Sequence, residues 1–177
     1  MSDTREDKNP HRDSYAVVGE LVLISNALDQ LLAEVLIEVL SLVRSPLLMP
    51  VIITLDPARK IEILKQRTKH ISQGEWKRGL KDFVENAEKV FKYRNIACHT
   101  QPILVGDQWT LKPFAAAKMF RVIDVANKRI KSVSMDELKS AISVAEKTLG
   151  SGVNLVENFQ RLNAEMAKRL AQKGHAP

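Results

Sequence analysis

Chemically versatile side chains are concentrated in one short stretch of the chain, residues 92–99. Arg94, Asn95 and His99 lie there at the end of an apolar pattern that is typical of a helix. In a helix, Asn95 and His99 are about 40° apart, whereas Arg94 is about 140° from His99 and has to reach back with its long side chain. We therefore expect a compact polar cluster at the end of this helix.

These three side chains offer the chemistry of metal-free phosphodiester cleavage. Arginine is a permanent, forked donor that suits phosphate oxygens, and histidine exchanges a proton near neutral pH. In RNA, the ribose 2′-hydroxyl loses a proton and attacks the adjacent phosphorus, and the departing 5′-oxygen takes up a proton. His99 is the predicted acid or base, Arg94 the predicted charge clamp, and Asn95 the residue predicted to orient one of them.

Three residues just before the cluster, Lys89, Lys92 and Tyr93, are the predicted substrate-binding residues. Tyr93 either donates a hydrogen bond to substrate or packs its ring beneath the cleft, and we favour packing. Cys98 has no second pair of residues at metal-ligand spacing, so we expect a small packed side chain there and no metal site. The chain also lacks a glycine-rich nucleotide cradle, and we expect no cofactor.

The spacing from Arg94 to His99 resembles the R-x4-H motif of the HEPN superfamily. These small helical proteins include many prokaryotic ribonuclease toxins and abortive-infection proteins. The residue after the arginine is usually polar in that family and often asparagine, as Asn95 is here. Residues 56–64 resemble the Lys-Ile-x-x-Leu helix of HEPN-like proteins, and the order of helices is similar over residues 13–170.

The resemblance implies a cytoplasmic homodimer with a role in toxin–antitoxin systems or phage defence. Because one histidine per chain cannot easily serve as both base and acid, two copies of His99 and Arg94 would share one cleft. Apolar residues 47–53 offer a surface for this pairing. RNA is the expected substrate, and a cognate antitoxin is a further expected partner. Some members carry a tyrosine two residues after the histidine that an antitoxin modifies, whereas this chain has Gln101, so we do not expect that control.

The predicted function is therefore a metal-independent endoribonuclease with a composite active site at a homodimer interface. Two alternatives stay open at this point. The chain is compatible with a non-catalytic HEPN-like dimer that binds nucleic acid or a partner protein. It is also compatible with a helical interaction protein in which the motif is a coincidence.

Composition places the chain among soluble, helix-rich single domains. It has 177 residues, 45% apolar and 27% charged, with only 7 Gly and 7 Pro. The single cysteine excludes an internal disulfide and is compatible with a reducing cytoplasm. Mixed charge at the N-terminus predicts no secretory signal, and acids within residues 16–43 favour a buried helix over a membrane span.

The net charge of +6 is confined to the segment that leads into the motif. Residues 57–94 hold eleven Lys or Arg against five Asp or Glu, and the rest of the chain is balanced. A basic surface beside a phosphate clamp favours an RNA partner. The alternative is that these charges are simply solvated helix faces.

The predicted fold class is all-α, an antiparallel bundle of four to five helices with a short β-hairpin after the motif helix. One domain, residues 13–170, lies between a disordered tail, residues 1–12, and a frayed basic tail, residues 171–177. Capping signals start helices at Asp13, at Asp56 with Pro57, at residues 72–75 and at residues 134–137. Prolines keep residues 45–53 from being helical throughout.

The second half of the chain is predicted to hold the irregular elements. Residues 102–112 read as the hairpin, residues 115–127 as a further helix and residues 129–133 as a short strand. Apolar spacing from Leu138 to Met166 predicts one long last helix that continues through Gly150 and Gly152, with a break there as the less favoured alternative.

Overall fold

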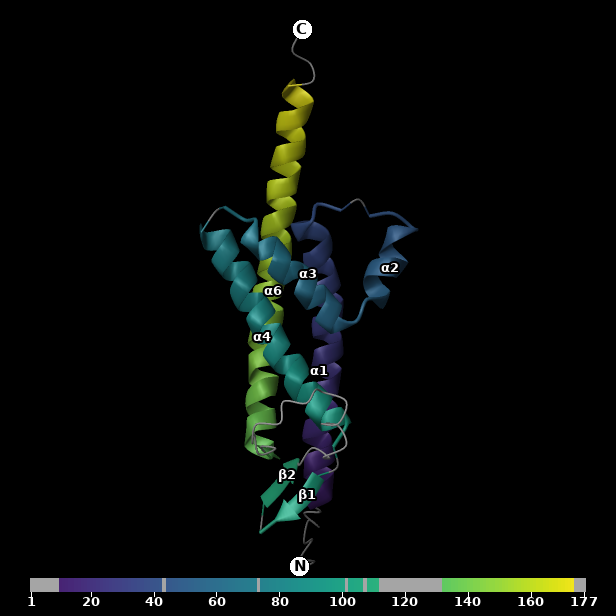
Figure 1. The fold of residues 1–177 in the computed structure, drawn as a ribbon, viewed down its shortest axis with the longest axis vertical. Coiled ribbons are helices and arrows are strands. Elements are labelled where there is room, and N and C mark those ends of the chain that lie inside the picture. Colours follow the sequence, from purple (N-terminus) through teal and green to yellow (C-terminus); the bar gives the residue numbers. More distant parts are fainter. Residues whose placement is uncertain are drawn as a thin grey trace, which may run out of the picture.

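The computed structural model describes residues 10–42, 44–72, 74–100, 102–106, 108–111 and 132–173, and within them the fold is helical with one small sheet (Figure 1). Its helices are α1 (Pro10–Val39), α2 (Leu48–Thr54), α3 (Pro57–Lys69), α4 (Gly74–Cys98) and α6 (Met135–Lys173). α1 and α6 run side by side in the same direction, and α4 runs opposite to both. The all-α prediction with a short β excursion is confirmed.

The core is formed where α1, α3, α4 and α6 meet. The apolar stripe predicted for α1 is buried along most of its length, and α4 contributes a second stripe at helical spacing. The principal buried residues are Leu21, Leu28, Leu32, Val35, Leu64, Leu80, Phe83, Val84, Ala87, Val90 and Leu138.

The length and apolar composition of α1 would also let Asp13–Val39 cross a membrane, with a mean hydropathy of 1.5 and 28% of the most apolar window buried. Core helices of soluble proteins and signal sequences pass the same test.

Both ends of α1 differ in detail from the prediction. The helix begins at Pro10, so Asp13 lies in its first turn and not at the cap, and the predicted tail is three residues too long. An acidic residue in the first turn still stabilises the helix dipole. The helix ends at Val39, short of the predicted end near Arg44.

A left-handed residue closes α1, and α6 holds that end in place. Ser41 has φ +51°, its N–H donates to Glu38 O at 3.1 Å, and Leu42 N–H donates to Ile37 O at 2.9 Å. Asn163 of α6 accepts from Ser41 Oγ at 2.8 Å and donates to Glu38 O at 2.9 Å. The end of α1 is therefore fixed to the C-terminal half of α6.

A charged cluster surrounds this junction. Arg44 Nη2 donates to Glu34 Oε2 at 2.6 Å and to Glu38 Oε1 at 2.9 Å. The hydrogen bonds from Glu38 and then Glu34 raise the pKa of the Arg44 guanidinium above its ordinary value.

Local signals set the start of α3 as predicted. Asp56 Oδ1 accepts from Arg59 N–H at 2.9 Å, and Pro57 occupies the first helical position. The proline-bounded segment 45–53 is helical only in part, as predicted, because α2 begins at Leu48 and includes Pro50. Of the residues of α2, Ile52 is buried while Val51 and Ile53 remain exposed.

The small sheet follows the motif helix. β1 (Pro102–Val105) pairs antiparallel with β2 (Gln108–Leu111), and Gly106 in the turn has φ +62°. β3 (Val133–Ser134) pairs with β2 at the far end of the predicted 129–133 strand. The predicted helix over residues 115–127 lies outside the described residues.

The capping box that opens α6 is confirmed. Glu137 N–H donates to Ser134 Oγ at 3.1 Å, and Ser134 N–H donates to Glu137 Oε2 at 2.9 Å. α6 then runs unbroken to Lys173, three residues into the predicted frayed tail, and its last turns extend beyond the other helices (Figure 1). Met166 and Leu170 on this extension are 46% and 71% exposed.

The two glycines inside α6 are expected to respond in opposite directions to substitution by alanine. A Cβ at Gly152 would lie 2.5 Å from Leu31 Cδ2 and 2.6 Å from Phe83 Cε2, whereas a Cβ at Gly150 would meet nothing within 4 Å. Gly150→Ala should stabilise the protein by about 0.5–1 kcal/mol through helix propensity. Gly152→Ala should destabilise it by about 1–2 kcal/mol, because overpacking exceeds the same gain.

Urea unfolding of the two alanine variants measures this difference. Gly150→Ala serves as the matched control, because it makes the same chemical change only two residues away, on an exposed face of the same helix. An equal rise in stability for both variants would show that α6 does not pack closely against α1 and α4 at Gly152.

Candidate active site at the end of the motif helix

The motif lies at the C-terminal end of α4, and the buried face of this helix fixes its position in the fold. Its apolar residues pack against α1, α3 and α6, and α4 ends at Cys98, as predicted, directly before His99. The N–H of His99 donates to Asn95 O at 3.2 Å and to Ile96 O at 3.3 Å. The backbone of His99 is therefore held by the last turn of the helix while its side chain is exposed.

The guanidinium of Arg94 bonds the side chain of the next residue, Asn95. Its Nη1 donates to Asn95 Oδ1 at 3.2 Å, so the amide orients the guanidinium. The Nε of Arg94 is buried and has no hydrogen-bond partner among the described residues. An unpaired buried donor is uncommon in native structures.

The predicted compact cluster is only partly formed within one chain. Arg94 and Asn95 are joined, but no contact joins either side chain to the ring of His99 in the part of the chain that the structure describes. The cause is helical geometry, since Arg94 projects towards the core side of α4 and His99 projects away from it, about 140° around the axis. One chain therefore presents the guanidinium and the imidazole on different sides of the helix.

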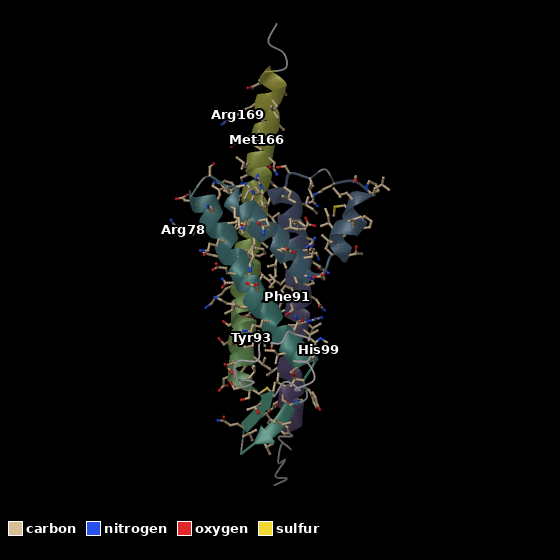
Figure 2. The ribbon with its side chains drawn as sticks, in the orientation of Figure 1. Arg78, Phe91, Tyr93, His99, Met166 and Arg169 are labelled. Carbon is tan, nitrogen blue, oxygen red and sulfur yellow. The ribbon has the colours of Figure 1, made fainter. Side chains whose placement is uncertain are left out.

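The three predicted substrate-binding residues lie in an arc around α4. Lys92 is about 20° from His99, Lys89 about 80° and Tyr93 about 120° around the helix axis. Figure 2 shows Tyr93 and His99 on opposite sides of the lower part of α4. Tyr93 is half-buried and packs on the core, as we favoured from the sequence.

Lys89 and Tyr93 line a pocket of about 220 Å³ between α4 and the start of α6. Glu137 and Ser140 of α6 line its opposite side. These two residues were not predicted as site residues, because nothing in their spacing reveals that α6 packs against this part of α4. The capping-box position of Glu137 was the only signal that drew attention to it.

The basic surface in the structure is smaller than the sequence predicted. Lys60 is buried, Lys65 pairs with Glu88 at 2.7 Å, and Lys81 lies 3.8 Å from Glu85. By contrast, Lys89 and Lys92 are exposed and form no ion pair within the described ranges. The unpaired cations of α4 nearest the motif are thus the two that were predicted to bind substrate.

The prediction for Cys98 was wrong, because its side chain is exposed. It is the last residue of α4 and lies just past Ala97, where the buried stripe ends. No group of three or more His, Cys, Asp or Glu that could hold a metal ion occurs among the residues that the structure describes.

Comparison with known proteins finds no relative of this chain. No family model matches the chain, and no curated protein and no solved structure shows significant similarity to it.

Proposed function

We propose that this protein is a metal-independent endoribonuclease of the HEPN type, active in the cytoplasm as a homodimer. The observation that carries the proposal is the arrangement at the end of α4, where Asn95 holds the guanidinium of Arg94 and His99 is exposed in the next turn. The resemblance of this spacing to the R-x4-H motif supplies the reaction class. A toxin or phage-defence role with a cognate antitoxin is part of the same proposal.

In the proposed reaction, the neutral imidazole of one His99 takes the proton of the ribose 2′-hydroxyl. The 2′-oxygen then forms a bond to phosphorus as the bond to the 5′-oxygen breaks. The protonated imidazole of the second His99 gives its proton to the departing 5′-oxygen. The products are a 2′,3′-cyclic phosphate and a 5′-hydroxyl, and Arg94 neutralises charge on the phosphoryl oxygens.

A surface suited to pairing lies beside this site. The end of α4 packs across the N-terminal half of α1 (Figure 1). The exposed side of α1 there carries Ala16, Gly19, Leu23 and Ala27, with the exposed Glu20 at the edge of this stripe. Leu23 is 72% exposed, and small neighbours let two helices approach closely. The apolar segment 47–53 lies towards the other end of α1, so we assign the pairing of motif helices to α1.

RNA cleavage in excess EDTA, together with the solution mass from size-exclusion chromatography with light scattering, tests the proposal. We expect a dimer that cleaves RNA, and a Leu23→Glu variant that is monomeric and inactive. Ile53→Glu is the matched control, because Ile53 is 57% exposed on α2 and distant from the proposed interface. A strictly monomeric wild-type protein would contradict the composite site.

Mixing wild-type and His99→Ala chains separates a shared site from two independent sites. If each cleft needs both imidazoles, mixed dimers are inactive, and adding a threefold excess of the variant should lower activity per wild-type chain about fourfold after subunit exchange. The measurement is the initial cleavage rate at a fixed wild-type concentration. Unchanged activity per wild-type chain would show that one histidine per chain suffices.

A further inference from the structure

We propose that the C-terminal extension of α6, residues 164–173, binds an acidic amphipathic helix of a partner protein. The extension begins directly after Asn163, which contacts the end of α1, and it runs past the other helices (Figure 1). It is therefore about 15 Å long. Residues 164–172 are all exposed. Most of the stability of a helix in a protein comes from packing of its apolar face, so a partner would complete this part of α6.

An apolar stripe runs along α6 from the core onto the extension. Leu155 and Phe159 are buried, and the ring of Phe159 makes an edge-to-face contact with Trp76 in the first turn of α4, with the centroids 4.8 Å apart. Met166 and Leu170 continue the stripe at helical spacing but are 46% and 71% exposed. Side chains four residues apart form the ridge that fits a groove on a second helix. The exposed end of the stripe therefore continues past the start of α4 and suits a helical partner.

Positive charge is concentrated at this end of the molecule. Residues 67–78 and residues 161–173 each hold four Lys or Arg against one Glu, so together they carry a net charge of +6, equal to that of the whole chain. Arg169 lies about 60° from Met166 around α6. Figure 2 shows Arg78, near the start of α4, and Arg169 at the same end of the molecule. A helix on the stripe would bring its flanking residues to these cations, so we expect those residues to be acidic.

Helix dipoles do not account for all of these features. The dipole favours Arg169 near the end of α6, but it disfavours Lys77, which lies in the first turn of α4. Lys77, Arg78 and Arg169 form no ion pair with any other residue that the structure describes. RNA also binds basic surfaces, but phosphate contacts would leave Met166 and Leu170 uncovered. An acidic helix matches both the charge and the apolar stripe.

The probe for this surface is a fluorescein-labelled peptide of about three heptads, with leucine at positions a and d and glutamate at positions e and g. We expect fluorescence anisotropy to show saturable binding that weakens as the salt concentration rises. Met166→Gln and Leu170→Gln should each lower the affinity about tenfold, because each removes apolar surface from the contact. Arg169→Glu should lower it about tenfold through charge repulsion.

Two substitutions elsewhere on α6 are the matched controls. Val153→Gln matches Met166→Gln, because Val153 is 49% exposed and lies outside the extension. Lys147→Glu matches Arg169→Glu, because Lys147 is also an exposed cation of α6. Neither control should change the affinity for the peptide. Lys77 and His99 are about 33 Å apart along α4, so all of these variants should keep the rate of RNA cleavage, and the two proposals are tested independently.

Three kinds of result would overturn the inference. The first is the absence of saturable peptide binding, or equal binding of a peptide with lysine at positions e and g. The second is unchanged affinity in folded Met166→Gln and Leu170→Gln. The third is a different occupant: a lower solution mass for Leu170→Gln would indicate a second copy of this chain. Likewise, binding of oligouridylate or phosphatidylglycerol vesicles that is tighter than peptide binding and is lost in Arg169→Glu would indicate nucleic acid or a membrane.

Discussion

Replacing His99 with alanine is expected to lower the rate of RNA cleavage in excess EDTA by about 10²- to 10⁴-fold. The imidazole is the group proposed to move both protons, and no other histidine among the described residues lies on α4. The side chain is exposed and its anchoring contacts are made by the backbone, so the variant should keep its fold. The measurement is the initial cleavage rate of a labelled single-stranded RNA, with the fold checked by circular dichroism.

His70→Ala is the matched control for this experiment. His70 is also an exposed histidine directly after a helix, at the cap of α3, and belongs to no proposed site. Its substitution should leave the cleavage rate unchanged. Equal rates for wild type, His99→Ala and His70→Ala would exclude His99 from the chemistry. Salt-sensitive RNA binding without any cleavage would instead select the non-catalytic dimer.

Arg94 and Asn95 show which part of the candidate site could be predicted from the sequence. Helical spacing placed Arg94 about 140° from His99 and predicted that its side chain would have to reach back to complete the cluster, whereas in the structure Arg94 bonds the adjacent Asn95 and makes no contact with the ring of His99 among the described residues. Spacing along one helix could not predict the pocket, because Glu137 meets Tyr93 only through the packing of α6 on α4. Residues on one element are related by local geometry, whereas residues on two elements are related by a packing that the pattern does not encode.

In the fold, too, local features were predicted from the sequence, whereas features that depend on packing between helices were not. The cap at Asp56 and the capping box at Glu137 are local hydrogen-bonding signals, and both were predicted correctly. Continuity of α6 through Gly152 was also predicted, but the close approach of Leu31 and Phe83, which leaves no room for a side chain at this position, is seen only in the structure. Lys60 was counted as part of a basic surface, although it is buried, because charge patterning alone does not show which face of α3 packs inwards.

Buried Lys60 makes α3 sensitive to a change on a different helix. Its Nζ donates to Asp29 Oδ1 of α1 at 2.8 Å and to Ile53 O at 3.3 Å, and its side chain is 1% exposed. An ammonium group without its carboxylate in such a setting costs several kcal/mol. Asp29→Ala is therefore expected to lower the free energy of unfolding by about 3 kcal/mol, near the lower end for buried pairs because Asp29 itself is 31% exposed.

Urea unfolding of a double-mutant cycle isolates the origin of this loss. Lys60→Met keeps the apolar part of the side chain and removes the charge, so we expect it to change the free energy of unfolding by no more than about 1 kcal/mol. In the Lys60→Met background, Asp29→Ala should lower the free energy of unfolding by less than about 1 kcal/mol further. The Lys65–Glu88 pair is the matched control, because its 2.7 Å distance is similar but its side chains are 42% and 56% exposed. Glu88→Ala should cost less than about 1 kcal/mol. If Asp29→Ala and Glu88→Ala lower the free energy of unfolding equally, the environment of Lys60 is as well solvated as the surface. If the losses from Asp29→Ala and Lys60→Met are additive, Asp29 stabilises α1 without acting through Lys60.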